Sequence, residues 1–235
     1  MNQIKARIGN FTSSEIYKLI KRDRSGKGFG APALDYIDEK NMARRLGRSL
    51  TTDCNARPLV WGNLLEPIAF RPLPFGYELK SKTTIVHPDY DFWSGSPDGT
   101  SPGSVFDIKC PITLKSFCQF VDSEGIEAIR AEHSDGEKYY WQLVSNAILT
   151  GSDQAELIVF MPYLTDLPEI RLIADNDDAP EGKWIYYAKD HELPYLIEGG
   201  HYNSVNIIRF DVPQSDKDLL TESVKMAGDK LIKRS

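Results

Sequence analysis

One stretch of the sequence, Ser96 to Pro111, constrains the fold of this chain more than any other. Within it, the residues from Ser104 to Cys110 alternate in character and include valine and phenylalanine, which favour the pleated, half-buried surface of a β-strand. The sequence therefore predicts a short strand here. The tetrapeptide Ser96-Pro97-Asp98-Gly99 carries the residue types of a tight turn. We expect this turn to join the strand to a neighbouring strand over residues 82–93 in a hairpin.

Three polar side chains of this stretch are expected to converge. On a strand, residues two apart share a face, so Asp107 and Lys109 point the same way while Ile108 points into the core. The turn can deliver a second carboxylate, that of Asp98, to the same place. Two carboxylates beside one ammonium group form a site for a hard cation with a proton donor or acceptor next to it. Phosphodiester cleavage needs such a combination.

The chemistry of cleavage explains these residue types. Mg²⁺ prefers oxygen ligands and keeps several waters, so one or two carboxylates suffice to hold it. The ion polarises a phosphoryl oxygen and acidifies the attacking water, and a lysine on the same face can orient or deprotonate that water. Each piece alone has a plainer interpretation, because Pro-Asp-Gly is a common turn and an Asp-x-Lys pair is often a solvated surface pair. Their order and spacing together favour the catalytic interpretation.

Composition and cysteine usage set wider bounds. The 235 residues are 41% hydrophobic, with no visible linker, so one domain over residues 1–235 is expected. No apolar run approaches the length of a membrane span, and the N-terminus lacks a signal-peptide pattern, so no membrane association is expected. The three cysteines, Cys54, Cys110 and Cys118, are odd in number and widely spread. They favour a reducing, cytoplasmic compartment and are too few for a four-cysteine iron–sulfur cluster within one chain.

The charge of the chain is unevenly distributed. Its net charge is −6, yet residues 1–60 carry 12 lysines and arginines against 6 acidic residues, and the remainder carries 16 against 28. A basic helical N-terminal part suits a protein that offers one face to phosphate, although a charge run is more often a solvated face. The acidic segment 175–182 lacks the spacing of a calcium loop and is expected to face solvent.

Apolar periodicity predicts an α/β fold in which helices surround a small sheet. Asn63 is a plausible cap for one of the helices, with Pro67 near its start. No role is assigned to residues 166–204. Helices are expected over residues 12–20, 32–46, 62–70, 138–150 and 215–233, and strands over 82–93, 104–110, 156–161 and 205–211.

Four blocks of sequence resemble the PD-(D/E)xK nuclease superfamily, and within it the lambda-type phage exonucleases and their YqaJ-like relatives. The resemblance extends over roughly residues 7–163, and the four blocks follow one another in the family's order. It implies a restriction-endonuclease-like core with a central mixed β-sheet flanked by helices. The blocks are Arg7-Ile8-Gly9-Asn10-Phe11-Thr12-Ser13-Ser14-Glu15, then Trp61-Gly62-Asn63-Leu64-Leu65-Glu66-Pro67, then Ser96-Pro97-Asp98-Gly99 followed by Asp107-Ile108-Lys109-Cys110-Pro111, and finally Tyr139-Tyr140-Trp141-Gln142-Leu143.

The resemblance implies a role for each matching residue. The side chains of Asp98 and Asp107 and the backbone carbonyl of Ile108 would ligate Mg²⁺, or Mn²⁺ in its place. Lys109 would position or activate the attacking water. Further roles fall to Glu66 as an additional acid near the metal, Gln142 as a hydrogen-bonding partner of the water or scissile phosphate, and Arg7, Ser14 and Ser96 as a pocket for a 5′-terminal phosphate.

The activity implied is a Mg²⁺-dependent 5′-to-3′ exonuclease that acts on the ends of linear double-stranded DNA and leaves 3′ overhangs for recombination. The family also implies a ring-shaped trimer and a single-strand annealing protein as partner. Two alternatives remain: a structure-selective or restriction-like endonuclease, and a catalytically silent DNA-binding protein on the same fold. Two departures from the family stand out, because Asp107 occupies a position where lambda-type enzymes usually carry glutamate, and Val144 one where relatives often carry a second glutamine.

Overall fold

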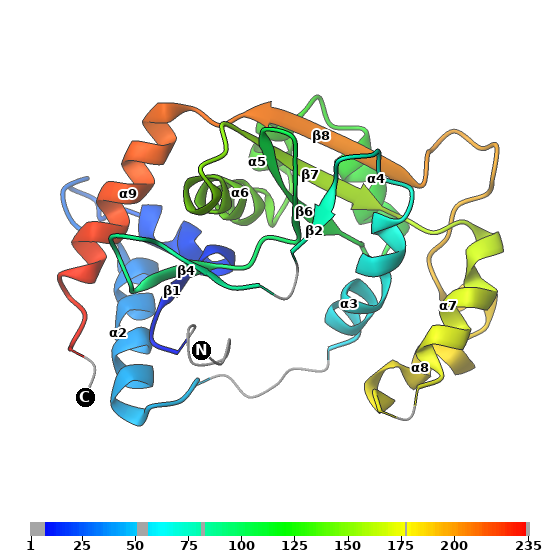
Figure 1. The fold of residues 1–235 in the computed structure, drawn as a ribbon, viewed down its shortest axis with the longest axis horizontal. Coiled ribbons are helices and arrows are strands. Elements are labelled where there is room, and N and C mark those ends of the chain that lie inside the picture. The colour runs from blue at the N-terminus through cyan, green and yellow to red at the C-terminus, as the bar shows by residue number, and fades with distance from the viewer. Residues whose placement is uncertain (1–7, 51–55, 81–82, 177, 234–235) are drawn as a thin grey trace.

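A computed structural model describes residues 8–50, 56–80, 83–176 and 178–233 (Figure 1). Arg7 and Cys54 therefore lie outside the described residues. The centre of the fold is a five-stranded mixed sheet with the strand order β2-β5-β6-β7-β8. Its strands are β2 (Glu78–Leu79), β5 (Gly99–Ser101), β6 (Ser104–Lys109), β7 (Gln154–Phe160) and β8 (Val205–Asp211). The predicted mixed sheet flanked by helices is confirmed.

The direction of the central strands follows from their connections. β6 and β7 run parallel, with Asp107 opposite Leu157, because the helical segment between them carries the chain back across the sheet. β5 pairs antiparallel with β2 and β6, and β8 pairs antiparallel with β7. The helices between β6 and β7 are α4 (Leu114–Val121), α5 (Ile126–Glu132) and α6 (Gly136–Thr150).

Alternate residues of the sheet enter two separate apolar clusters. Val105 and Leu157 belong to a cluster that contains the apolar side of α6, whereas Phe106 and Ile158 belong to one that contains the apolar side of α3 (Arg57–Phe70). Because side chains alternate between the faces of a strand, each face packs against its own helix. Asp107 and Lys109 share the period of Val105 and therefore belong to the α6 face.

A second, three-stranded sheet has the order β1-β4-β3 and lies beside the N-terminal and C-terminal helices. In Figure 1, α2 and α9 stand at one end of the molecule and α7 and α8 at the other, with the central sheet between them. The elements are β1 (Phe11–Thr12), β3 (Ile85–Val86), β4 (Trp93–Gly95), α2 (Ala31–Leu46), α7 (Leu167–Ala174), α8 (Lys183–Tyr187) and α9 (Gln214–Gly228), with short 3₁₀ segments at Ser13–Ile20, Leu164–Asp166, Pro180–Gly182 and Asp190–Glu192.

The predicted hairpin between residues 82–93 and β6 is wrong. β6 pairs with β5, and the turn between them is Pro102-Gly103, where Gly103 adopts a φ of 81°. Proline followed by a residue with positive φ is the sequence of a type II turn, which glycine enters without strain. The expected strand 82–93 is instead two short strands, β3 and β4, of the smaller sheet.

The predicted helices are mostly present, with different ends. The helix predicted to begin at Gly62 begins at Arg57, so Asn63 is not its cap and Pro67 lies inside it. The first helix is a 3₁₀ segment, and the C-terminal helix ends at Gly228 rather than at residue 233. The helices α4, α5, α7 and α8 were not predicted, because each has at most eight residues and too few turns to establish a periodicity.

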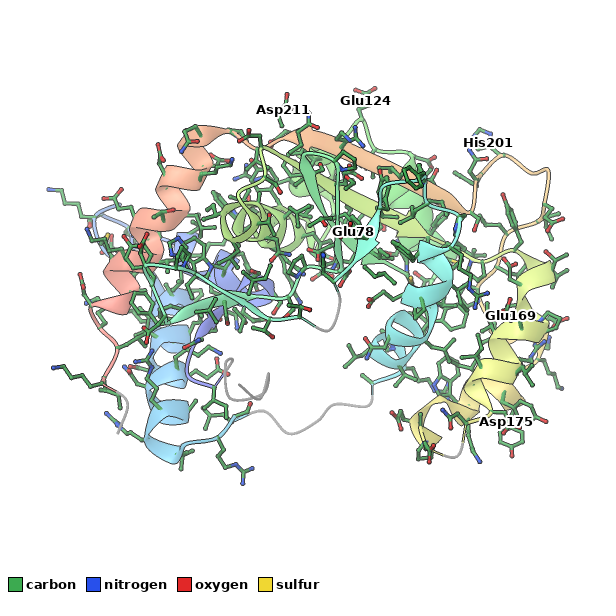
Figure 2. The ribbon with its side chains drawn as sticks, viewed as in Figure 1. Glu78, Glu124, Glu169, Asp175, His201 and Asp211 are labelled. Carbon is green, nitrogen blue, oxygen red and sulfur yellow. The ribbon has the colours of Figure 1, made fainter. Side chains whose placement is uncertain are left out.

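The predicted acidic loop is exposed as expected. Asp175 and Glu181 face solvent, and only Gly182 at the end of the described part of the segment is buried. Figure 2 shows Asp175 and several other carboxylates that point outward around the rim of the molecule, among them Glu124, Glu169 and Asp211. Among the described residues, no helix combines the length and the apolar character needed to cross a bilayer.

Candidate functional site

Asp98, the residue before β5, is hydrogen-bonded directly to strand β6. Its Oδ2 accepts a hydrogen bond from the backbone N–H of Ile108 at 2.7 Å. Burial raises the pKa of Asp98, and the nearby Lys109 ammonium partly offsets this effect. The structure thus brings Asp98 to the strand that carries the other two predicted residues, although through a different turn from the one expected.

Asp107 lies at the centre of this group and is 1% exposed. Both of its carboxylate oxygens accept a hydrogen bond from Nδ2 of Asn146 on α6, at 3.3 Å and 3.2 Å. Burial raises the pKa of Asp107 to about 7, with a further contribution from the Asp98 carboxylate and an opposing one from Lys109. Two neighbouring carboxylates that resist ionisation form a site where a cation would be favourable.

Lys109 completes the group at the end of β6. Its Nζ lies 5.0 Å from the centre of the Tyr139 ring, over the ring face. Burial acts to lower the pKa of Lys109, but the carboxylates of Asp107 and Asp98 outweigh this and raise it. Lys109 is therefore a charged ammonium group in the metal-free protein, and it balances part of the negative charge of the pair.

The donor set fits a hard divalent cation. Carboxylate oxygens are the ligands that Mg²⁺ prefers, and the ion completes its shell with water, so a pair of carboxylates is a sufficient anchor. Among the described residues, no cluster of three or more histidine, cysteine, aspartate or glutamate side chains is arranged as a metal site. The half-buried carboxylate of Asp98 and the buried carboxylate of Asp107 are the feature of this structure that matches the predicted ion.

Two further predicted residues face the same region from separate helices. Glu66 is half-buried on α3, and its charge, together with that of Asp98, adds to the burial that raises the pKa of the Cys110 thiol. Both carboxylates therefore lie near the end of β6. Gln142 is half-buried on α6, three residues after Tyr139 and four before Asn146. This spacing places it on the helix side that contacts Asp107 and Lys109.

Two of the residues predicted to bind a terminal phosphate, Ser14 and Ser96, lie beyond the ends of β1 and β4. These strands pair in parallel, with Thr12 opposite Ser94, so Ser14 and Ser96 follow the paired residues at the same end of the sheet. The Ser14 hydroxyl lies 3.5 Å from Oγ1 of Thr12, and the Ser96 hydroxyl 3.1 Å from Oγ1 of Thr84. Arg7, the third member of the predicted pocket, lies outside the described residues.

Tyr139 and Asn146 contact the predicted site but were not predicted. The signal for Asn146 is an amide in a mostly apolar stretch of α6, where a buried amide is unfavourable unless it has a partner. The signal for Tyr139 is its position three residues before Gln142, on the same helix side. Both signals become specific only once the register of α6 against β6 is known.

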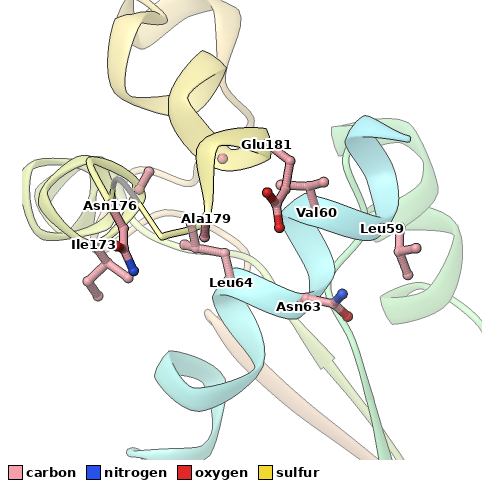
Figure 3. A pocket seen from close by; sticks show the side chains of 10 residues that line it. Leu59, Val60, Asn63, Leu64, Ile173, Asn176, Ala179 and Glu181 are labelled. Atoms are coloured by element: carbon pink, nitrogen blue, oxygen red, sulfur yellow. The ribbon is translucent and has the colours of Figure 1, made fainter. Parts of the chain in front are cut away.

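A separate cavity of about 280 Å³ opens between α3 and the segment that follows α7 (Figure 3). The side chains of Leu64, Val60 and Ile173 contribute apolar lining, and Glu181 and Asn63 contribute polar groups. None of the residues predicted to act in catalysis or phosphate binding lines this cavity.

The geometry can be compared with known proteins. The family of the YqaJ-like viral recombinase domain matches residues 4–153. No curated protein matches the chain. Among solved structures, the phage-related exonuclease from Haemophilus somnus 129PT is similar, with a TM-score of 0.61 and 18% identity over 94% of this chain and 92% of that one.

The alkaline exonuclease LHK-Exo from Laribacter hongkongensis is similar as well, with a TM-score of 0.55 and 17% identity over 97% of this chain and 92% of that one. Its complex with dAMP gives a TM-score of 0.57 and 18% identity over 95% and 88%. These structural likenesses establish a shared fold. The family match extends over more than half of the chain, and the chain belongs to the YqaJ-like viral recombinase domain family.

Proposed function

We propose that the protein is a Mg²⁺-dependent exonuclease that degrades one strand of linear double-stranded DNA from its 5′ end and leaves a 3′ overhang for recombination. The observation that supports this most is the group formed by Asp98, Asp107 and Lys109 at the end of β6, with both carboxylates near one another and the ammonium beside them. Family membership and a fold shared with an alkaline exonuclease support the same reaction class.

Each residue has a part in the proposed reaction. Asp98 and Asp107 would hold the ion together with the backbone carbonyl of Ile108, and Mg²⁺ bound there would supply Lewis acidity toward the scissile phosphate. Lys109, as an ammonium group, orients the attacking water by donating a hydrogen bond to its oxygen. Its charge also stabilises the negative charge that develops on the phosphate in the transition state.

Two residues outside the central group assist. Glu66 adds a carboxylate from α3 on the side of Cys110, and Gln142 hydrogen-bonds the water or the phosphate, since its amide both donates and accepts. Mn²⁺ would also fit the proposed site, because it too accepts oxygen ligands in octahedral geometry.

The preference for a 5′ end comes from a phosphate pocket. Ser14 and Ser96 stand at the shared end of β1 and β4, where two hydroxyls and the N–H groups at the start of the following helical segment can bind an anion. Arg7 contributes a guanidinium group that grips phosphate with two hydrogen bonds. A terminal phosphate held there fixes which strand enters the cleavage site.

The wider setting of the proposed activity follows the family. The chain acts as one nuclease domain in the cytoplasm of a bacterium or phage-infected cell, as a ring-shaped homotrimer, with a single-strand annealing protein as partner. Light scattering of the purified protein tests the trimer, and a monomeric mass in the presence and absence of DNA rejects it.

The test of the activity uses linear DNA labelled at either the 5′ or the 3′ end, and closed circular DNA, each incubated with protein and Mg²⁺. We expect early release of the 5′ label, a retained 3′ label and intact circles. Equal attack on circles would show an endonuclease on the same fold, and no cleavage with either Mg²⁺ or Mn²⁺ would show a catalytically silent DNA-binding protein. The control is Lys109→Ala, which should fold and bind metal but not cleave.

A further inference from the structure

The amide of Asn146 makes an unusual contact with the centre of the proposed site. Asn146 is completely buried on α6, and its Nδ2 reaches both carboxylate oxygens of Asp107, at 3.3 Å and 3.2 Å. A donor that contacts both oxygens restrains the rotation of the carboxylate as well as its position. The contact therefore defines which way Asp107 presents its oxygens to a bound ion.

The other end of the same amide makes no comparable contact. Within the described residues, Oδ1 of Asn146 is buried without a hydrogen-bond partner. It lies against Gly95, where an added Cβ would stand only 2.7 Å from Oδ1. The amide is thus held by packing at its oxygen and by Asp107 at its nitrogen.

This arrangement is unfavourable for the fold alone. A buried carbonyl oxygen without a donor weakens the folded state, and an apolar side chain would avoid the cost. Among the buried neighbours of Asn146 on α6, Leu143, Val144, Ala147 and Leu149 are apolar, and the hydroxyl of Ser145 has hydrogen-bond partners. An amide at this position is explained by what its nitrogen does to Asp107.

We propose that Asn146 is a positioning residue that locks the Asp107 carboxylate in the orientation in which it shares a divalent cation with Asp98. The inference rests on the proposed function, since it assigns a role within that same site. Asn146 is too deeply buried to touch DNA or the attacking water. It acts through Asp107, as groups that hydrogen-bond a metal ligand commonly do.

The adjacent Ser145 offers a matched control. Its hydroxyl lies 2.8 Å from that of Ser13 and accepts a hydrogen bond from Nε1 of Trp93 at 2.9 Å. These contacts join α6 to the 3₁₀ segment Ser13–Ile20 and to strand β4, and do not include Asp107. Substitution of Ser145 therefore disturbs an equally buried hydrogen-bond network of α6 without removing the restraint on the carboxylate.

The experiment compares Asn146→Leu, which keeps the number and branching of the side-chain non-hydrogen atoms, with Asn146→Ala and Ser145→Ala in the full chain. The dissociation constant for Mn²⁺ or Mg²⁺ is measured by calorimetry, and the melting temperature is measured without metal. We expect Asn146→Leu to weaken metal binding by about tenfold or more while its melting temperature stays close to that of the unmodified protein. Ser145→Ala should lower the melting temperature and leave the metal affinity near its original value.

A spectroscopic measurement tests the contact without relying on the folding of the Asn146 variants. In ¹⁵N-labelled, metal-free protein, the side-chain amide signals of Asn146 should shift when Asp107→Asn is introduced, because the amide loses its charged acceptor. They should stay in place in Lys115→Gln, a substitution of an exposed residue on α4. Unmoved Asn146 signals in Asp107→Asn would overturn the proposal.

The calorimetric result separates this inference from the proposed function. If the unmodified protein binds metal and cleaves DNA while Asn146→Leu retains its metal affinity, the positioning role is rejected and the nuclease proposal stands. If the unmodified protein neither binds a divalent ion nor cleaves DNA, both fall together. A loss of affinity in Asn146→Leu that Ser145→Ala reproduces to the same extent would show a general effect of packing and reject the positioning role.

Discussion

Oδ2 of Asp98 lies 2.7 Å from the backbone nitrogen of Ile108 and accepts its hydrogen bond. Ile108 stands between Asp107 and Lys109, so the Asp98 side chain is hydrogen-bonded to the backbone that joins these two residues. The contact closes the short β5–β6 hairpin on the side of the site. It means that Asp98 has two separable tasks, one as an acceptor that stabilises the hairpin and one as a negatively charged ligand.

Substitution of Asp98 separates these two tasks. Asp98→Asn keeps an oxygen that accepts from Ile108 but loses the charge, so it should retain nearly all of the stability and lose metal-dependent cleavage. Asp98→Ala should lose cleavage and about 1–2 kcal/mol of unfolding free energy, because a backbone N–H loses its charged acceptor. Urea denaturation and a nuclease assay measure both; equal stability of the two variants would contradict the structural task.

The raised pKa of Asp107 predicts how stability changes with pH. Between the ordinary value of 3.8 and about 7, the folded protein binds more protons at this carboxyl than the unfolded chain does. The unfolding free energy of the metal-free protein should therefore fall as pH rises through this interval and level off above it. Denaturation series with and without Asp107→Asn measure the difference, since the substitution should reduce the slope.

The affinity for a divalent metal should change with pH in the opposite direction from the unfolding free energy. A cation competes with the proton on Asp107, so the affinity for Mg²⁺ should increase as pH rises toward about 7 and then become constant. Calorimetric titrations at several pH values test this. An affinity that declines over the same interval would contradict the assignment of Asp107 as a ligand.

The Tyr139 ring should hold the Lys109 ammonium group through the contact with its ring face, and its hydroxyl should not be needed. Nζ of Lys109 stands 5.0 Å from the ring centre, and a shielded contact of this kind contributes about 1–2 kcal/mol. Tyr139→Phe should cleave DNA at nearly the original rate, whereas Tyr139→Leu should reduce kcat by about tenfold, the equivalent of ~1.4 kcal/mol. Rate measurements at saturating metal distinguish the two, and equal rates would exclude the ring contact.

The buried Glu156 is the basis of a prediction about the free energy of unfolding rather than about catalysis. It is fully buried on β7 and accepts hydrogen bonds from Tyr77, Ser101 and Arg209. Arg209→Met would leave this buried carboxylate without its charged partner and should lower the unfolding free energy by about 2–3 kcal/mol.

The matched control for Arg209→Met is Arg71→Met. Arg71 pairs with Glu169 at 2.5 Å, and both side chains are about half exposed. Loss of an exposed pair should change stability by less than about 1 kcal/mol. Urea unfolding midpoints of the two variants compare the effects directly; equal losses would show that burial of Glu156 does not decide the outcome.

The local pattern of the chain was enough to predict β6 and its side-chain directions. Alternation places Asp107 and Lys109 on one face because the period of a strand is two, whatever surrounds it. The helix over α6 and the strands β7 and β8 were predicted for the same reason, since each is long enough to display its own periodicity. The four sequence blocks also predicted the family, which the match over residues 4–153 confirms.

Pairing between segments could not be predicted in the same way. The hairpin partner of β6 is the three-residue strand β5, which is too short to show a pattern. Residues 82–93 were therefore given a place in the sheet that they do not occupy. Helix α3 begins five residues earlier than predicted because Pro58 suits the first turn of a helix, a local signal that the Asn63 cap obscured.

By itself the sequence determined which residue types stand on the same strand face, because backbone geometry ties side-chain direction to position along the chain. The contacts of those side chains arise from the packing of the folded chain: Asn146 with Asp107, Tyr139 with Lys109, and the Ile108 N–H with Asp98. Such contacts join residues that are 10 to 39 positions apart. They depend on how helix and strand pack together, and packing is set by the whole core rather than by any one segment.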